Sequence, residues 1–233
     1  NDTRQHSDRH SPDDVIAHAM HYTPPSPPKT VKFGKLLQAG ALTVVPVTSS
    51  KLLRKKPAVK LGHRQLTTGK VEITEVGQQG FVPRLRAENR TKFYVLLIEG
   101  DQLLGAKQNR ICNSTVLLKP NSISEIPVSC VEEGRWQHVS HNFTSSKFHA
   151  APTLRRRLAE SKKRTRQASR GQKAHESNQT VVWNEVKVFA ATTGVYSDTQ
   201  SMEEVFDKSL KQQQVPQKIK YSGDANGWIL AID

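Results

Sequence analysis

The chain has 233 residues, 35% of them hydrophobic, and a formal net charge of +14. This length is enough for a hydrophobic core in one large domain or two small ones. No stretch reaches the roughly 20 apolar residues of a membrane-spanning helix, and the two cysteines are too few for a disulfide scaffold or a cysteine-rich zinc site. We therefore expect a folded protein without a membrane span or a metal site, and the residues identify no cofactor.

The positive charge lies mainly in two segments. Residues 51–64 hold six basic residues and no acidic one, and Arg155–Lys173 holds nine basic residues and the single acidic residue Glu160. A fold that binds nucleic acid usually spreads its positive charge across a folded face. We interpret the second segment as a basic insert at about residues 151–176, which is either a solvated or flexible segment or an arm that binds nucleic acid or another anionic surface.

Residues 1–35 are predicted to be a disordered lead. They are polar and histidine-rich and contain the proline-rich run Thr23–Lys29, a composition that favours extended polyproline geometry over helix or sheet. Five Asn-x-Ser/Thr triplets occur in the chain and would suit glycosylation of a secreted protein. Such triplets also arise by chance in a chain rich in serine and threonine, so we favour an intracellular protein over a secreted one.

The first half of the folded region is predicted to be rich in β-strands. The predicted strands are residues 40–48, 71–76, 81–89, 93–98, 111–118 and 123–131. Pro46 is expected to place its strand at an edge or a bulge, because proline lacks the N–H that a ladder needs. The connection through Pro120 and Asn121 is typical of a hairpin. Strands about ten residues apart indicate an antiparallel, sandwich-like or barrel-like sheet.

The second half changes to a helical pattern. Residues 154–170 are compatible with a helix but have almost no apolar face. An amphipathic helix is expected from Gln179 to a cap at Gly194, and another is expected to begin near Asp198. Gly227–Ile232 is predicted to be a closing strand.

These elements together predict a single α+β domain over residues 36–233. Its antiparallel, sandwich-like sheet would carry the C-terminal helices packed on it.

The densest polar cluster of the chain runs from Glu99 to Arg110, directly after the most apolar predicted strand. Another polar segment, Cys130–Trp136, follows the last strand of the predicted hairpin. Antiparallel partners run in opposite directions, so the hairpin would bring Arg110 and Glu132 to the same end of the sheet, with the loop Glu99–Asn109 over that end. Loops gathered at one end of a sheet are a common place for binding groups.

The residue types in these segments suit a phosphorylated ligand with a flat ring. Arginine offers a planar fork to phosphate, amides both donate and accept hydrogen bonds, and tryptophan offers a face for stacking. The candidate ligand-binding residues are Lys107, Gln108, Asn109, Arg110, Arg135 and Trp136. Carboxylates could position a hydroxyl, hold a divalent metal or activate water, and the candidate catalytic residues are Glu99, Asp101, Glu132 and Glu133. The same groups could instead satisfy one another and hold a loop in place.

The two cysteines, Cys112 and Cys130, face each other across the predicted hairpin. They could form a disulfide, although two free buried thiols are the simpler expectation. No nucleophile elbow, phosphate-loop signature or dinucleotide fingerprint occurs in the sequence.

Three motifs resemble a family of uncharacterised proteins. They are Gly105–Arg110 (Gly-Ala-Lys-Gln-Asn-Arg), Pro127–Glu132 (Pro-Val-Ser-Cys-Val-Glu) and Gly134–Trp136 (Gly-Arg-Trp). The family is named for its association with genes for ADP-ribosyl-glycohydrolases and the rhodanese/phosphatase superfamily. The pair Asp101-Gln102 departs from the acidic pair of the family pattern, and a weaker resemblance extends over about residues 36–233.

The resemblance implies a link to NAD and ADP-ribose metabolism, which agrees with a site suited to phosphate and a flat ring. The leading hypothesis is a domain that binds or processes an ADP-ribose-like or other phosphorylated nucleotide, so the expected partner is a nucleotide-like small molecule. Two alternatives stay open: a hydrolase that acts on an ADP-ribosyl or phosphate linkage, and a protein that binds nucleic acid or an anionic surface through Arg155–Lys173. The oligomeric state is left open.

Overall fold

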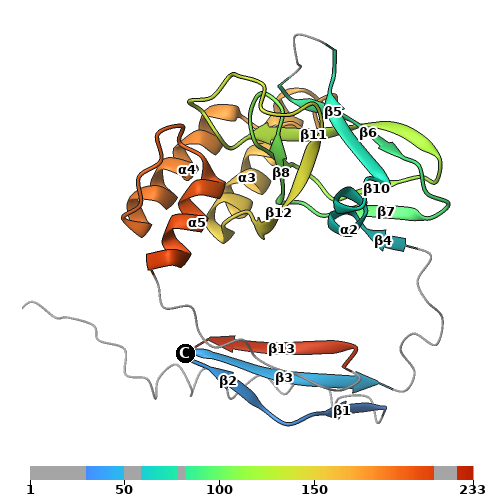
Figure 1. Ribbon diagram of the computed structural model, residues 1–233, viewed down its shortest axis with the longest axis vertical. Coiled ribbons are helices and arrows are strands. Elements are labelled where there is room, and N and C mark those ends of the chain that lie inside the picture. The colour runs from blue at the N-terminus through green and yellow to red at the C-terminus, as the bar shows by residue number, and fades with distance from the viewer. Residues whose placement is uncertain (1–29, 50–58, 78–81, 213–224, 233) are drawn as a thin grey trace, which may run out of the picture. The chain divides into compact units, whose positions relative to one another are not determined.

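The computed structural model describes residues 30–49, 59–77, 82–212 and 225–232. The chain divides into two compact units, each with its own strands (Figure 1). The terminal unit consists of Asn1–Lys55 and Pro216–Asp233, and the main unit consists of Lys56–Val215.

The terminal unit contains a four-stranded antiparallel sheet that combines early and late parts of the sequence. Its central strand is β3 (Leu42–Ser49), with β1 (Val31–Phe33) and β2 (Leu37–Ala39) on one side and β13 (Gly227–Ile232) on the other. Pro46 therefore lies in a central strand and not at an edge. Proline is tolerated there because Pro46 lies opposite the break between β1 and β2. Neither strand has a residue paired with it, so no ladder hydrogen bond is lost through its missing N–H.

The predicted lead falls largely outside the described residues. Residues 1–29 are not described, and residues 31–33, which composition assigns to the lead, form β1. Of the basic segment over residues 51–64, residues 51–58 lie outside the described residues, and residues 59 and 60 belong to a strand.

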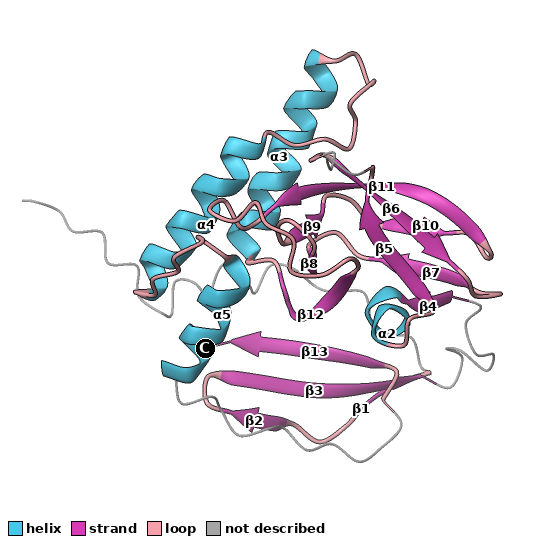
Figure 2. Cartoon of the chain, turned by 45° about the horizontal axis from the view of Figure 1, so that its top comes forward, coloured by secondary structure: helices cyan, strands magenta, loops and turns pink. Residues whose placement is uncertain are grey.

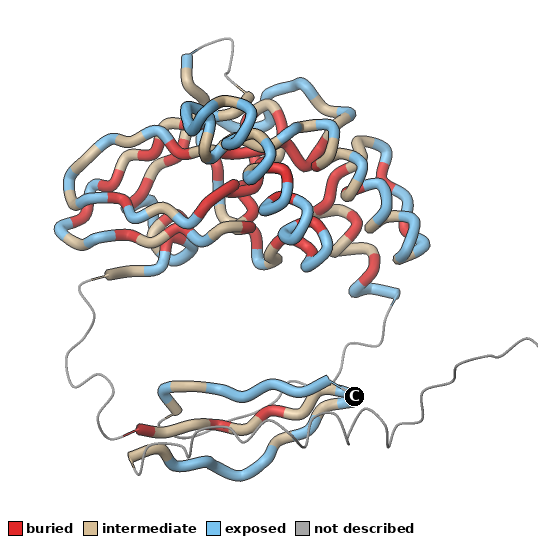
Figure 3. Tube along the Cα trace, turned by 180° about the vertical axis from the view of Figure 1, so that it is seen from behind, coloured by how far each residue is buried: buried red, intermediate tan, exposed pale blue. Residues whose placement is uncertain are grey.

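The main unit is built on a curled six-stranded antiparallel sheet with the order β12-β8-β9-β11-β6-β5. Its strands are β5 (Val71–Glu75), β6 (Arg84–Asn89), β8 (Asp101–Gly105), β9 (Arg110–Cys112), β11 (Ser122–Cys130) and β12 (Phe143–His149). An isolated bridge between Thr74 and Asn142 connects the two outer strands, so the curled sheet is nearly closed. Ile73, Leu85 and Leu103, each without exposed surface, belong to the core of this sheet (Figure 3).

A three-stranded sheet contributes to the same core. In it β7 (Tyr94–Leu97) lies between β10 (Val116–Leu118) and β4 (Val59–Leu61), and α2 (Gly62–Thr67) follows β4 directly. The predicted hairpin of residues 111–118 with 123–131 is therefore only partly correct. Cys112 pairs with Val128, but after the bend that follows β9 the chain turns away, and β10 pairs with β7.

The C-terminal helices α3 (Pro152–Ala168), α4 (Gln179–Thr193) and α5 (Met202–Gln212) stand together at one side of the main unit's strands (Figure 2). The ends of α4 agree with the prediction: Asn178 Oδ1 accepts from Thr180 N at 2.9 Å, and Gly194 has a left-handed φ of 64°. The last helix begins later than expected, because Ser201 first pairs with Glu132. The α+β fold with C-terminal helices on an antiparallel sheet is confirmed.

The basic insert is a packed helix, α3. Leu154 and Leu158 are buried on one face and meet Val182 and Val186 of α4 in a second core, and the buried Ser161 accepts a hydrogen bond from Asn178 N at 2.8 Å. Two leucines four residues apart are enough because α4 and the sheet supply the other apolar surfaces. None of the helices in the described ranges has the length and the apolar character needed to span a bilayer.

Replacing Leu158 with alanine tests whether α3 is integral to the main unit. Because Leu158 has no exposed surface, we expect Leu158→Ala to lower the free energy of unfolding by about 2–5 kcal/mol, measured by urea denaturation. The control Leu117→Ala, at a side chain that is 49% exposed, should cost less than about 1 kcal/mol. Equal effects of the two changes would contradict a packed α3.

Candidate functional site

The strand β8 separates the candidate residues into two groups. The expectation that Glu99–Asn109 forms one loop over a single end of the sheet is wrong, because Asp101–Gly105 is a strand between β12 and β9. Glu99 and Asp101 lie at its beginning and Lys107–Asn109 beyond its end. Gly100 and Gly105, with φ of 90° and 129°, bracket the strand in conformations that other residues rarely adopt.

Glu132 and Arg135 form the centre of a polar network beyond the end of β8. Arg135 donates to Glu132 Oε2 at 2.6 Å and to the Ala106 carbonyl at 2.7 Å. The Glu132 carboxylate also accepts from Asn109 N at 3.1 Å and from Thr199 Oγ1 at 3.0 Å. The two motif segments therefore meet, as expected, and their polar groups are joined largely to one another.

Arg110 has no exposed surface. Its guanidinium donates to Gln108 Oε1 at 2.9 Å, contacts Cys130 Sγ and lies 3.4 Å from Glu75 Oε1. Arg110 Nε and Glu75 Oε2 have no hydrogen-bond partner among the described residues. Buried charges are costly unless they are paired and hydrogen-bonded, so this pair is only partly satisfied.

Trp136 is the exposed member of this group. Half of its surface is accessible, and Lys107 Nζ and Arg110 Cζ lie 5.3 Å and 5.9 Å from its ring centre, within cation–π range. The structure thus gathers the predicted ligand-binding residues beyond the end of β8. Four of them, Gln108, Asn109, Arg110 and Arg135, already bond to the protein.

The four candidate carboxylates have four different surroundings. Glu132 belongs to the network with Arg135. Glu133 forms an ion pair with Lys187 of α4 at 2.7 Å, and Glu99 forms one with Lys162 of α3 at 2.6 Å. Asp101 instead pairs with a histidine of β12. The structure does not bring the four carboxylates together, and no cluster of three or more potential metal ligands occurs in the parts of the chain that it describes.

Both cysteines are free and buried. The register pairs Cys112 with Val128 and Cys130 with Arg110, so the two thiols are not directly opposite each other. Burial raises the pKa of both thiols, that of Cys130 to about 11 although the nearby Arg110 lowers it. At neutral pH both remain protonated, which disfavours a thiolate nucleophile.

A hollow of about 370 Å³ lies where β8, β12 and α2 meet. Its polar lining comes from Asp101 and Gln102 of β8, from His63 of α2, and from Ser145, Ser146, Lys147 and His149 of β12. This volume falls at the small end of the roughly 300–1,000 Å³ range of ligand sites. This space, which we call the β8–β12 hollow, contains one of the predicted catalytic residues.

Asp101 orients His149 in the β8–β12 hollow. One carboxylate oxygen lies 3.3 Å from His149 Nδ1, and the other accepts from Ile98 N at 2.7 Å. A carboxylate that holds one ring nitrogen leaves the other nitrogen free for acid–base work or for binding. The neighbouring Gln102 is 1% exposed, and neither its Oε1 nor its Nε2 has a partner among the described residues.

A larger hollow, of about 450 Å³, lies between α3 and α4. Its Arg157 pairs with both Glu160 and Glu185, and none of its lining residues is a buried side chain left without a polar partner. Size alone does not identify a binding site, and we favour the β8–β12 hollow because it contains Gln102 and the Asp101–His149 pair.

Sequence reasoning identifies Asp101 but misses His63, Gln102, Lys147 and His149. The strand β12 is not predicted, because its Thr144, Ser145 and Ser146 interrupt the apolar alternation. The sequence singles out Gln102 only as a departure from the family pattern. An isolated histidine at position 149 gives no sign that it pairs with a carboxylate 48 residues earlier.

The Arg110–Glu75 pair can be tested by a double-mutant cycle. Arg110→Met leaves the Glu75 carboxylate buried without its cation, so we expect the free energy of unfolding to fall by about 3–5 kcal/mol. Adding Glu75→Gln should recover much of that loss, because the remaining groups are uncharged. Urea denaturation of the four proteins measures the coupling; if Arg110→Met costs the same in the Glu75→Gln variant as in the unsubstituted protein, charge pairing does not stabilise the interior.

Comparison with known families assigns the chain. No curated protein and no solved structure matches it. Residues 30–233 match the model of the ARG and Rhodanese-Phosphatase-superfamily-associated Protein domain. The match includes all three motifs around β8, β9 and β11 and every described element. The chain therefore belongs to the family of ARG and Rhodanese-Phosphatase-superfamily-associated Protein domains.

Proposed function

We propose that the main unit binds an ADP-ribose-like or other phosphorylated nucleotide in the β8–β12 hollow. The observation that carries the proposal is Gln102, a side chain 1% exposed whose amide atoms lack partners among the described residues. Buried polar groups in native proteins nearly always have hydrogen-bond partners. A ligand that both donates and accepts hydrogen bonds, as a sugar hydroxyl or a base edge does, would supply them once the amide, which is closed to solvent, turns toward the hollow.

The chemistry of the lining supports a ligand of this class. His63 and His149 offer ring nitrogens and Ser145 offers a hydroxyl, whereas the Lys147 ammonium is already paired with Asp207 at 2.8 Å. Leu61, Leu96 and Phe148 provide apolar surface for the flat part of a ligand. The family name links these domains to genes associated with ARG proteins, in agreement with a role in ADP-ribose metabolism.

If the ligand is processed, the Asp101–His149 pair is the candidate acid–base group for hydrolysis of an ADP-ribosyl or phosphate linkage. Its carboxylate lies 3.3 Å from the ring, and a histidine held in this way can transfer a proton near neutral pH. Glu99, Glu132 and Glu133 are each engaged by a cation, so they have less freedom for that role.

The residues beyond the end of β8 would have a different role in this proposal. Asn109, Arg110 and Arg135 would hold β8 and β9 in place. Lys107 and Trp136 remain predicted ligand contacts, and their use would require a second binding surface at that end of the strand.

The proposal predicts opposite effects of one substitution on stability and on binding. Gln102→Met keeps the side-chain volume but removes the unpartnered amide, so we expect equal or higher stability. We expect binding of ADP-ribose, measured by calorimetry, to weaken about tenfold, since hydrogen bonds contribute about 1 kcal/mol each.

The matched control is Asn113→Leu. Asn113 is also 1% exposed with an unpartnered amide but does not line the β8–β12 hollow, so its loss should leave binding unchanged. Chromatography of the titrated samples tells binding from turnover. Failure of NAD, ADP-ribose and mononucleotides to bind the unsubstituted protein more tightly than about 1 mM would refute the proposal.

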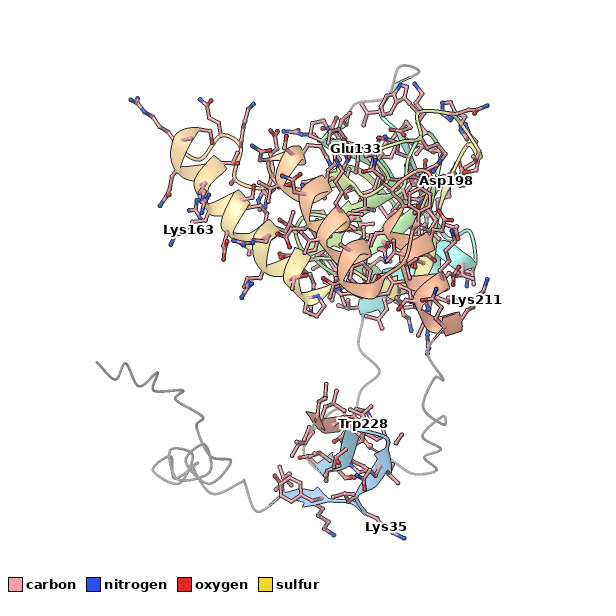
Figure 4. The ribbon with its side chains drawn as sticks, turned by 90° about the vertical axis from the view of Figure 1, so that its left-hand side faces the viewer. Lys35, Glu133, Lys163, Asp198, Lys211 and Trp228 are labelled. Atoms are coloured by element: carbon pink, nitrogen blue, oxygen red, sulfur yellow. The ribbon has the colours of Figure 1, made fainter. Side chains whose placement is uncertain are left out.

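The helix α3 supports a second candidate function, the binding of nucleic acid or another anionic surface. Lys163, Arg164 and Arg166 are exposed on α3, and no hydrogen bond or ion pair joins their side chains to the described residues. Lys163, labelled in Figure 4, extends outward from the helix.

A salt titration tests this second candidate. Changing Lys163, Arg164 and Arg166 together to glutamine should weaken binding of a single-stranded oligonucleotide and flatten the plot of log K against log salt by about two units, at roughly 0.7 per contact. The control removes the same charge at Lys70, Lys92 and Lys119, which are exposed elsewhere on the main unit. Equal losses in both triple variants would indicate a response to net charge and not binding by α3.

A further inference from the structure

His149 and the stem of Arg155 pack together over Gly100. A Cβ built on Gly100 would lie 2.8 Å from His149 Nε2 and 2.9 Å from Arg155 Cδ. A side chain at position 100 would force the His149 ring and the Arg155 chain to move, and the φ of 90° disfavours one independently. Glycine at this position therefore lets a ring nitrogen and an arginine from two different elements, β12 and α3, approach each other on the same turn of the backbone.

The anionic groups around this turn are already engaged. Asp101 accepts from Ile98 N and pairs with His149 Nδ1, while Glu99 pairs with Lys162 at 2.6 Å. By contrast, the guanidinium of Arg155 forms no hydrogen bond or ion pair with any residue in the described ranges, and neither does His149 Nε2. The turn thus presents the donors and the unpaired positive charge of the Arg155 guanidinium. His149 Nε2 becomes a donor as well when the ring is protonated, because the neutral ring carries its proton on the Nδ1 that faces Asp101.

The beginning of α3 adds to the same positive potential. The helix starts at Pro152, three residues after His149, and its N-cap residue Ala151 has no side chain that could accept from the first-turn N–H groups. The N-terminus of a helix of 17 residues favours an anion. A helix N-terminus alone does not identify a binding site. Two neighbouring side chains support one here: the Arg155 guanidinium, which has no partner in the described ranges, and the buried, unpartnered Gln102 of the adjoining β8–β12 hollow.

We propose that the Gly100 turn is an anion subsite that takes the phosphate of the ligand, bound by the Arg155 guanidinium and, when the ring is protonated, by His149 Nε2. The inference rests on the proposed function and makes it more specific. His149 connects the anion subsite to the β8–β12 hollow, because it lines the hollow and also covers Gly100. The uncharged, nucleoside-like part of the ligand lies in the hollow, and its phosphate lies at the start of α3, where the arginine fork suits phosphate oxygens.

The test compares two adjacent arginines on α3. Arg155 and Arg156 are both exposed and both lack side-chain partners in the described part of the chain, but only Arg155 contacts Gly100. The probes are ADP-ribose, adenosine monophosphate, adenosine and pyrophosphate, titrated by calorimetry at one salt concentration. We expect Arg155→Gln to weaken binding of the three phosphorylated probes about tenfold to hundredfold and to leave adenosine unchanged. Arg156→Gln should change every affinity by less than about threefold.

The outcomes separate this inference from the proposed function. Equal effects of Arg155→Gln and Arg156→Gln, or an equal loss of adenosine and adenosine monophosphate binding in Arg155→Gln, would overturn the subsite while leaving nucleotide binding in the hollow intact. If pyrophosphate binds in an Arg155-dependent way but no nucleotide binds more tightly than it, the subsite stands and the nucleotide proposal fails. Thermal melting of both variants should match that of the unsubstituted protein, because neither arginine is buried.

Discussion

The curled sheet of the main unit depends on the pairing of one buried charge. Arg110 is fully buried, and its partners come from different parts of the chain: Glu75 from β5, Cys130 from β11 and Gln108 from the motif before β9. An unpaired buried charge costs several kcal/mol, which is large beside the roughly 5–15 kcal/mol by which a domain is stable. A fold in which one of these strands is displaced would leave the charge of Arg110 unpaired, so it is disfavoured. The family motif Gly105–Arg110 supplies both this arginine and the amide of Gln108 that accepts a hydrogen bond from it.

The two ends of β8 differ in how completely their polar groups are hydrogen-bonded to the protein. Beyond its end, the network of Glu132, Arg135 and Asn109 leaves few polar groups without a protein partner. At its beginning, Asp101 and Gln102 line the β8–β12 hollow. Asp101 is paired with His149, whereas the amide of Gln102 has no hydrogen-bond partner among the described residues. A strand fixed at one end is a suitable support for groups that must be positioned accurately at the other.

Helices and strands whose ends are set by nearby residues are predicted well from the sequence. Asn178 and Gly194 determine the ends of α4 through contacts within a few residues, and alternation identifies β5. The strand β8 is missed because glycines and polar residues flank it, and only its pairing with β12 and β9 makes it a strand. The site depends even more on distant partners: Glu75 lies 35 residues from Arg110, and His149 lies 48 residues from Asp101. No spacing rule predicts such pairs. The first joins β9 and β5, which are not neighbours in the curled sheet, and the second depends on the pairing of β12 with β8.

The sheet of the terminal unit constrains the order in which the protein can fold during synthesis. β3 precedes the main unit in the sequence, whereas its longest partner, β13, follows it, with pairs from Leu42–Ile232 to Val47–Gly227. All residues of the main unit emerge from the ribosome before β13 does, and domains generally fold as units as they emerge. The main unit can therefore complete its core first, while one side of β3 is still unpaired. During that interval Val44, Val45 and Val47 are available to other chains, so the terminal sheet is the part of this protein for which protection by a chaperone during translation matters most.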